Sequence, residues 1–293
     1  MSKRSRSVGV YSPRQQFLHH TVDEFTTSTS VEPGVHTVRC GDMLADILYD
    51  ERPDSDTLLV FFSAAANHHH TWPLFSGASI AASINASLLS FSDPSIALGL
   101  TVSTGWTLGD YRYPYHRDVP DIVRKVADGR SIIMVGASAG GYAALHYGAK
   151  IPESFSVVMN PRTHLLLPPT GVQLHSTTLY QSQSPEHIST LVPVEPDLPE
   201  NKVLYLQNYA DHAYFSSHMI PYLHRLSPEM RVWTHLDYWG EGHVPMPKSE
   251  LVAFLSALIS DPGELLDSLR RFESVNRILD HHAGLNILHF AKQ

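Results

Sequence analysis

The chain has 293 residues, a formal net charge of −8 and 43% hydrophobic residues. This length suits one large α/β domain or two small ones. The negative charge, with no Lys/Arg-rich run after the first six residues, excludes a protein that wraps nucleic acid, because neutralising phosphates requires a concentrated basic surface.

The first residues and the apolar runs bear on targeting. Residues 2–6 are basic like the start of a signal peptide, but the apolar stretch that a signal peptide requires does not follow them. We therefore predict a frayed terminus. The longest apolar runs, such as residues 58–62, are far shorter than the ~18 residues of a membrane span. A single cysteine, Cys40, cannot form an intrachain disulfide and fits a reducing compartment. We therefore expect a soluble, cytoplasmic protein with no membrane span.

From residue 35 on, short β-rich apolar runs alternate with stretches of helical period, which is typical of a mainly parallel sheet flanked by helices. Residues 35–38 and 44–49 flank a Cys-Gly-Asp turn and predict an opening hairpin. Residues 57–62 are apolar after their threonine and predict a central strand buried on both faces. Further strands are predicted at 87–91, 131–135, 155–159, 203–206 and 232–236. Apolar residues three and four apart predict helices at 118–126, 141–149, 214–226 and 249–259.

Two regions interrupt this alternation. Residues 161–200 are rich in proline and predict an irregular excursion over the sheet edge that holds the active site, a candidate lid. The end of the chain is amphipathic and predicts a helical tail that packs on the domain or mediates dimerisation. The expected organisation is an N-terminal extension over 1–34, an α/β domain over 35–260 and a C-terminal tail over 261–293.

The strand predicted at 131–135 leads into Gly-x-Ser-x-Gly, centred on Ser138. Such a strand-to-helix turn exposes a serine hydroxyl, and Gly136 and Gly140 remove the clash between residues that crowd in it. The motif alone arises by chance in about one chain of this length in ten, but here an apolar strand precedes it and an Ala-rich helix follows. The alternative is a glycine-rich turn that allows close packing or cradles a phosphate; a Walker loop is excluded because no Gly-Lys-Ser/Thr follows.

A serine nucleophile of this kind needs a base and an acid from later strand ends, in the order Ser, Asp/Glu, His. His243 follows the last predicted strand in a glycine-flanked loop and can act as the base. Asp211 follows the preceding strand and can bond to the Nδ1–H of His243, with Asp237 as the runner-up acid. The predicted catalytic residues are therefore Ser138, Asp211 and His243.

Acyl transfer also requires hydrogen-bond donors for the developing oxyanion. One is expected to be the backbone N–H of Ala139. The second is expected from the loop after the strand at 57–62, at Ala64 or next at Ala65, because small side chains let an acyl oxygen approach the backbone. Three adjacent histidines, 68–70, follow this loop, but neighbours on an extended loop point in alternating directions, so no metal site is predicted.

Aromatic side chains flank the predicted site loops. In an apolar cleft they would bind an acyl chain or stack on a sugar, and the equally weighted alternative is ordinary packing of loops onto the sheet. The candidates are Trp72, Trp106, Tyr111, Tyr209 and Trp239.

With Ser138, Asp211 and His243 in this order, the chain resembles the α/β-hydrolase fold family over about residues 35–260. The resemblance implies an eight-stranded, mostly parallel sheet, an acyl-enzyme mechanism and no cofactor. The oxyanion loop departs from the His-Gly pattern common in this fold. The expected activity is a serine esterase acting on a small-molecule, glycan or lipid ester. The alternatives are an acyltransferase with the same triad, or a catalytically silent binding or scaffold protein of the kind associated with accessory secretion and surface-polysaccharide systems.

Overall fold

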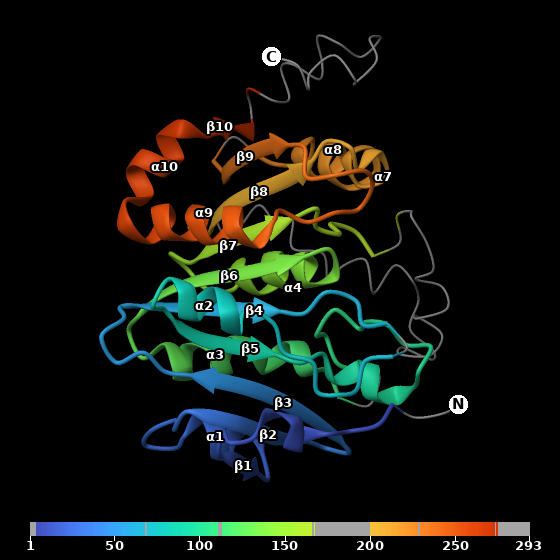
Figure 1. Ribbon diagram of the computed structural model, residues 1–293, viewed down its shortest axis with the longest axis vertical. Helices are drawn as coiled ribbons and strands as arrows, with labels where there is room; N and C mark the ends of the chain where they lie inside the picture. The colour runs from blue at the N-terminus through green and yellow to red at the C-terminus, as the bar shows by residue number, and fades with distance from the viewer. Residues whose placement is uncertain are drawn as a thin grey trace.

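The computed structural model describes residues 4–67, 69–110, 113–165, 167, 200–227, 229–272 and 274. Within these ranges, ten strands form one sheet in the order β1-β2-β3-β5-β4-β6-β7-β8-β9-β10 (Figure 1). Strands β4 to β9 run parallel, β3 is antiparallel to β2 and β5, and β10 is antiparallel to β9. The strands are β1 (Gln16–His19), β2 (Gly34–Cys40), β3 (Met43–Asp50), β4 (Thr57–Phe62), β5 (Ser87–Phe91), β6 (Ser131–Ala137), β7 (Phe155–Met159), β8 (Lys202–Asn208), β9 (Arg231–Asp237) and β10 (Arg270–Arg271).

Strands β2 to β9 confirm the eight strands predicted from the sequence. All six residues of β4 are buried, as expected for a strand between two parallel neighbours with helices on both faces. The carboxyl ends of β4, β6 and β8 point to the same side of the sheet in Figure 1. Loops after these strands therefore meet at one edge, where a site in an open α/β sheet is expected.

Helices cover both faces of the sheet (Figure 1). Helices α1, α3 and α4 and the α7-to-α8 segment bury apolar residues against one face, while α2 and α9 pack on the other. No helix in the described ranges has the length and hydropathy that a membrane crossing requires. The α-helices are α1 (Val22–Thr26), α2 (Ala78–Ser83), α3 (Val119–Ala127), α4 (Ala139–Gly148), α7 (His212–Tyr214), α8 (Ile220–Leu223), α9 (Lys248–Ser260) and α10 (Pro262–Ser268). Shorter helical turns are η1 (Val8–Tyr11), η2 (Pro94–Leu98), η3 (Tyr115–Arg117) and the π-helical η4 (Phe215–Met219).

Both ends of the chain contribute to the sheet. Within the expected N-terminal extension, β1 pairs in parallel with β2, and within the expected C-terminal tail, β10 pairs with β9. Most of the candidate lid, residues 168–199, and the tail from residue 275 on lie outside the described residues.

The prediction of a frayed terminus is wrong from Arg4 onward. Arg4 is 4% exposed, and its guanidinium donates to the carbonyls of Asn67 and His70, both at 2.7 Å. It also donates to backbone carbonyls in the segment 96–102. Arg6 forms an ion pair at 2.6 Å with Asp46, whose side chain is fully buried. Arg4 is buried because backbone carbonyls converge on its guanidinium, and Arg6, which is exposed, is held by a buried carboxylate. A reading of composition cannot detect either contact.

Candidate active site

Ser138 lies at the turn between β6 and α4. Its backbone has φ 52° and ψ −113°, a conformation that a non-glycine residue rarely adopts. A Cβ on Gly136 would come within 2.2 Å of the Gly140 backbone, and one on Gly140 within 2.3 Å of the Phe62 carbonyl oxygen. Both glycines are therefore required for this turn, and the geometry is that of a nucleophile elbow.

Asp211 and His243 meet at the same edge of the sheet. The Nδ1 atom of His243 lies 2.5 Å from Oδ2 of Asp211, which is 3% exposed and caps the start of α7. A donor at Nδ1 leaves Nε2 as the acceptor of the neutral imidazole. The runner-up acid, Asp237, lies at the end of β9 with half its side chain exposed, and its ion-pair partner is His235 at 3.8 Å.

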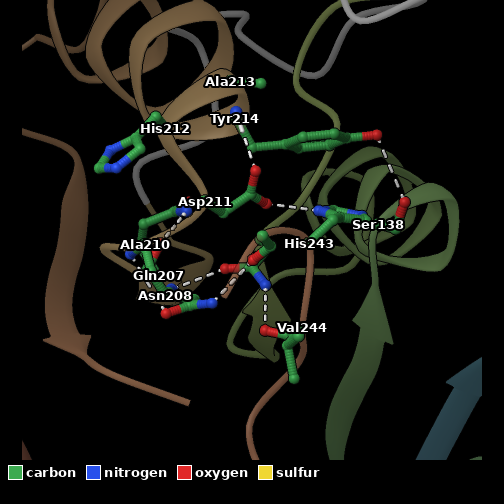
Figure 2. Close-up of polar contacts among 12 residues, drawn as sticks. Ser138, Gln207, Asn208, Ala210, Asp211, His212, Ala213, Tyr214, His243 and Val244 are labelled. Carbon is green, nitrogen blue, oxygen red and sulfur yellow. Dashed lines mark hydrogen bonds and ion pairs between the residues drawn. The ribbon is translucent and has the colours of Figure 1, made fainter. Parts of the chain in front are cut away.

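The imidazole of His243 lies between the Asp211 carboxylate and the Ser138 side chain (Figure 2). Ser138 Oγ is directed to the hydroxyl of Tyr214 at 3.5 Å, and within the described part of the chain no hydrogen bond joins it to His243. Catalytic hydrogen bonds are often long or unformed without substrate.

Tyr214 is a site residue that the sequence analysis missed. Its ring stacks on the imidazole of His243 with centroids 3.9 Å apart, and its backbone N–H donates to Oδ1 of Asp211. It thus contacts His243, Asp211 and, through its hydroxyl, Ser138. The only sequence signal is its position three residues after Asp211 at a helix start, which returns a side chain toward the capping residue.

Two buried asparagines hold the loop that carries His243, and they were also missed. At the end of β8, Asn208 Nδ2 donates to the carbonyls of Gly240 and Gly242, both at 2.8 Å. After β7, Asn160 Nδ2 donates to the carbonyl of Val244 at 2.7 Å, and its Oδ1 accepts from Asn208 N–H at 2.7 Å. The carbonyls of Gly240 and Gly242, before His243, and of Val244, after it, are therefore tied to two strand ends.

The candidate oxyanion donors come from two adjacent segments. Ala139 is the buried first residue of α4, while Ala64 and Ala65 are exposed directly after β4. Strand β4 pairs with β6 up to Phe62 and Gly136, so the loop after β4 begins beside the elbow. Helix starts present free backbone N–H groups, which suits an anionic oxygen.

The predicted substrate-binding aromatics divide into two groups. Trp72 and Trp106 are 5% and 3% exposed and pack in separate hydrophobic clusters, which agrees with the packing alternative. The guanidinium of Arg6 lies over the Trp72 ring at 5.0 Å. Tyr209 and Trp239 are half-buried at the edge that holds His243. Tyr111 lies outside the described residues.

The histidines after β4 give no sign of a metal centre in the described ranges. His70 Nδ1 accepts from the backbone N–H of Asn67 at 3.3 Å, and His68 lies outside these ranges. No group of three or more His, Cys, Asp or Glu side chains among the described residues could hold a metal ion.

The parallel sheet from β4 to β9, the antiparallel β2–β3 hairpin and the elbow after β6 define an α/β-hydrolase fold. The sequence matches no protein-family model and no curated protein.

Solved structures show the same fold. One is a capsule O-acetyltransferase of Neisseria meningitidis serogroup A, with a TM-score of 0.59 and 14% identity over 80% of this chain and 98% of that chain. A Pyrobaculum calidifontis esterase has a TM-score of 0.53 and 14% identity over 81% of this chain and 87% of its own. An S-formylglutathione hydrolase from Agrobacterium tumefaciens has a TM-score of 0.51 and 13% identity over 80% and 95%. At these identities the likeness establishes the fold.

Proposed function

We propose that the protein is a serine hydrolase that cleaves an ester-type acyl bond through Ser138, His243 and Asp211. The observation that carries this proposal is the 2.5 Å contact between Asp211 and His243 beside a serine held in a strained elbow. A packing turn would need the two glycines, but it would not need a buried carboxylate aligned with an imidazole at the same edge.

In the proposed first half-reaction, Ser138 Oγ attacks the acyl carbon while its proton moves to Nε2 of His243. The buried carboxylate of Asp211 stabilises the imidazolium, and the backbone N–H of Ala139, with that of Ala64 or Ala65, binds the oxyanion. The carbon–oxygen bond to the alcohol then breaks, and the Nε2 proton passes to the departing oxygen. In the second half-reaction, water attacks the acyl-enzyme, His243 takes its proton, and the carboxylic acid leaves as the proton returns to Oγ.

Water is the acceptor in the proposed hydrolase. The side chain of His243 is 37% exposed, so solvent reaches this residue. An acyltransferase with the same triad is the second candidate, favoured by the similarity to a capsule O-acetyltransferase over nearly the whole length of that chain. It would deliver the acyl group to an alcohol or sugar in preference to water.

The first experiment tests whether Ser138 is activated. We expect a fluorophosphonate probe to label the wild-type protein and Ser131→Ala, and to leave Ser138→Ala unlabelled. Ser131 is a matched control because it lies exposed at the opposite end of β6. An unlabelled wild-type protein would contradict the proposal and support a silent scaffold.

A second experiment separates the two enzymatic candidates. p-Nitrophenyl esters of increasing acyl length are supplied with and without acceptor alcohols and sugars, and the products are quantified. A hydrolase releases mainly carboxylic acid in both cases, whereas a dominant transacylated product would favour the acyltransferase.

A further inference from the structure

Tyr214 is placed beside the reacting atoms in a way that neither the elbow nor the triad explains. Its hydroxyl lies 3.5 Å from Ser138 Oγ, and its ring covers one face of the His243 imidazole at 3.9 Å (Figure 2). Stacking alone would require only an apolar or aromatic ring. Stacking on the imidazole therefore does not explain why this position has a hydroxyl.

The phenol is held rigidly in this position. Tyr214 is 7% exposed, and its backbone N–H donates to Asp211 at 3.3 Å. The ring also packs against His218 at 4.7 Å, and the guanidinium of Arg162 lies 5.9 Å from its centroid. A donor fixed in a mostly buried position stabilises developing charge without needing to reorganise during the reaction.

The chemistry determines which reacting atom lies near this hydroxyl. The departing alcohol oxygen is bonded to the carbon that Ser138 Oγ attacks, and it receives its proton from His243 Nε2. That oxygen must therefore lie close to both Oγ and Nε2. The Tyr214 hydroxyl lies next to Oγ on a ring stacked over the imidazole, which places it beside the same space.

Substrate attack would also free this hydroxyl. In the described part of the chain, Ser138 Oγ is its hydrogen-bond partner. Once Oγ turns to Nε2 and bonds to the acyl carbon, the phenol can donate to the neighbouring alcohol oxygen, on which negative charge grows as its bond to carbon breaks.

We propose that Tyr214 is a catalytic residue for the alcohol side of the ester, donating a hydrogen bond to the oxygen that leaves in acylation and to the one that enters in deacylation. This inference rests on the proposed function. Tyr214 keeps its proton throughout. The bond that breaks is the one between the acyl carbon and the alcohol oxygen, and the proton that this oxygen receives comes from Nε2 of His243. The tyrosine stabilises the negative charge on the oxygen until that proton arrives.

The test is the dependence of Tyr214→Phe on the leaving group. The leaving group of an alkyl acetate is a strongly basic alkoxide, whereas p-nitrophenolate leaves without help from a donor. We expect kcat/KM for alkyl acetates to fall about 10- to 100-fold, with p-nitrophenyl acetate changed less than about threefold. Because the readout is a ratio of two substrates on one sample, any loss of folded enzyme cancels. Tyr238→Phe is the matched control, since the hydroxyl of this exposed tyrosine donates to Glu241.

Two results would overturn the inference: an equal loss on both classes of ester, which would indicate a merely structural tyrosine, or no loss on the alkyl esters. Fluorophosphonate labelling of Tyr214→Phe should persist, because fluoride leaves unprotonated. If the wild-type protein itself is unlabelled, the proposed function has failed, and a failure of the tyrosine inference alone leaves that labelling intact.

Discussion

The asparagine at the end of β8 offers a strong test of how the base is positioned. Asn208 is fully buried, and its amide makes two hydrogen bonds of 2.8 Å to the carbonyls of Gly240 and Gly242. It also accepts from the N–H groups of Ala210 and Trp239, both at 3.3 Å. At about 1 kcal/mol net for each short bond and less for each long one, Asn208→Ala should lower the free energy of unfolding by about 3 kcal/mol. For a domain of this size, Tm should fall by about 6–12 °C.

The two bonds to the glycine carbonyls hold the loop of His243, so their loss should also reduce the fraction of enzyme with its base in place. If the loss of these two hydrogen bonds costs about 2 kcal/mol in positioning the base, labelling by a fluorophosphonate should be about 30-fold slower. Asn201→Ala is the matched control, because Asn201 is also buried, at the opposite end of β8, and its amide donates to Ser154 at 2.9 Å. The thermal unfolding of both variants is measured first, and labelling is done at a temperature at which both are folded. If Asn208→Ala is labelled as fast as Asn201→Ala, the loop does not depend on this side chain and the reasoning fails.

Three further predictions concern single side chains. Asp211→Asn should keep the fold but lower kcat by about 10³- to 10⁴-fold, because the amide favours the wrong tautomer of His243; a wild-type kcat would contradict the triad. Burial lowers the pKa of His36 from 6.5 to about 4. As the pH falls below 6.5, the unfolded chain therefore binds a proton that the folded protein does not bind, and the free energy of unfolding should decrease from its value at pH 7. Urea unfolding should show a loss of about 2 kcal/mol between pH 7 and pH 5, and the loss should be smaller in His36→Gln. Burial raises the pKa of Cys40 to about 12, so iodoacetamide at pH 8 should modify it only after denaturation; rapid modification of the native protein would show that the thiol is accessible.

The central sheet could be predicted because its strands are short apolar runs whose burial follows from the sequence alone. β4, buried along its whole length, is the clearest example. The edge strands lacked that signal: β1 alternates exposed and half-buried residues over four positions, and β10 consists of two arginines. Their pairing depends on backbone hydrogen bonds to a neighbour that is already folded, and side-chain hydropathy does not report such bonds.

The same distinction applies to the site. The placement of Ser138, Asp211 and His243 at one edge of the sheet could be predicted, because the carboxyl ends of parallel strands meet there. Asn160 and Asn208 could not, because an asparagine after a strand is also ordinary turn chemistry, and their partners are carbonyls distant in sequence. Tyr214 could not be distinguished from a core aromatic until the structure placed its hydroxyl near Oγ.

The guanidinium of Arg4 joins carbonyls at positions 67 and 70 to others at 96 and 102. Arg4 precedes these acceptors by 63 to 98 residues, so during synthesis the full set of hydrogen bonds cannot form until Val102 has been made. Cleavage just after Arg4, or a bulky fusion attached there, should loosen that segment at the edge beside the elbow while leaving the distant sheet intact. The order of the segment after β4 therefore depends on a side chain far earlier in the sequence.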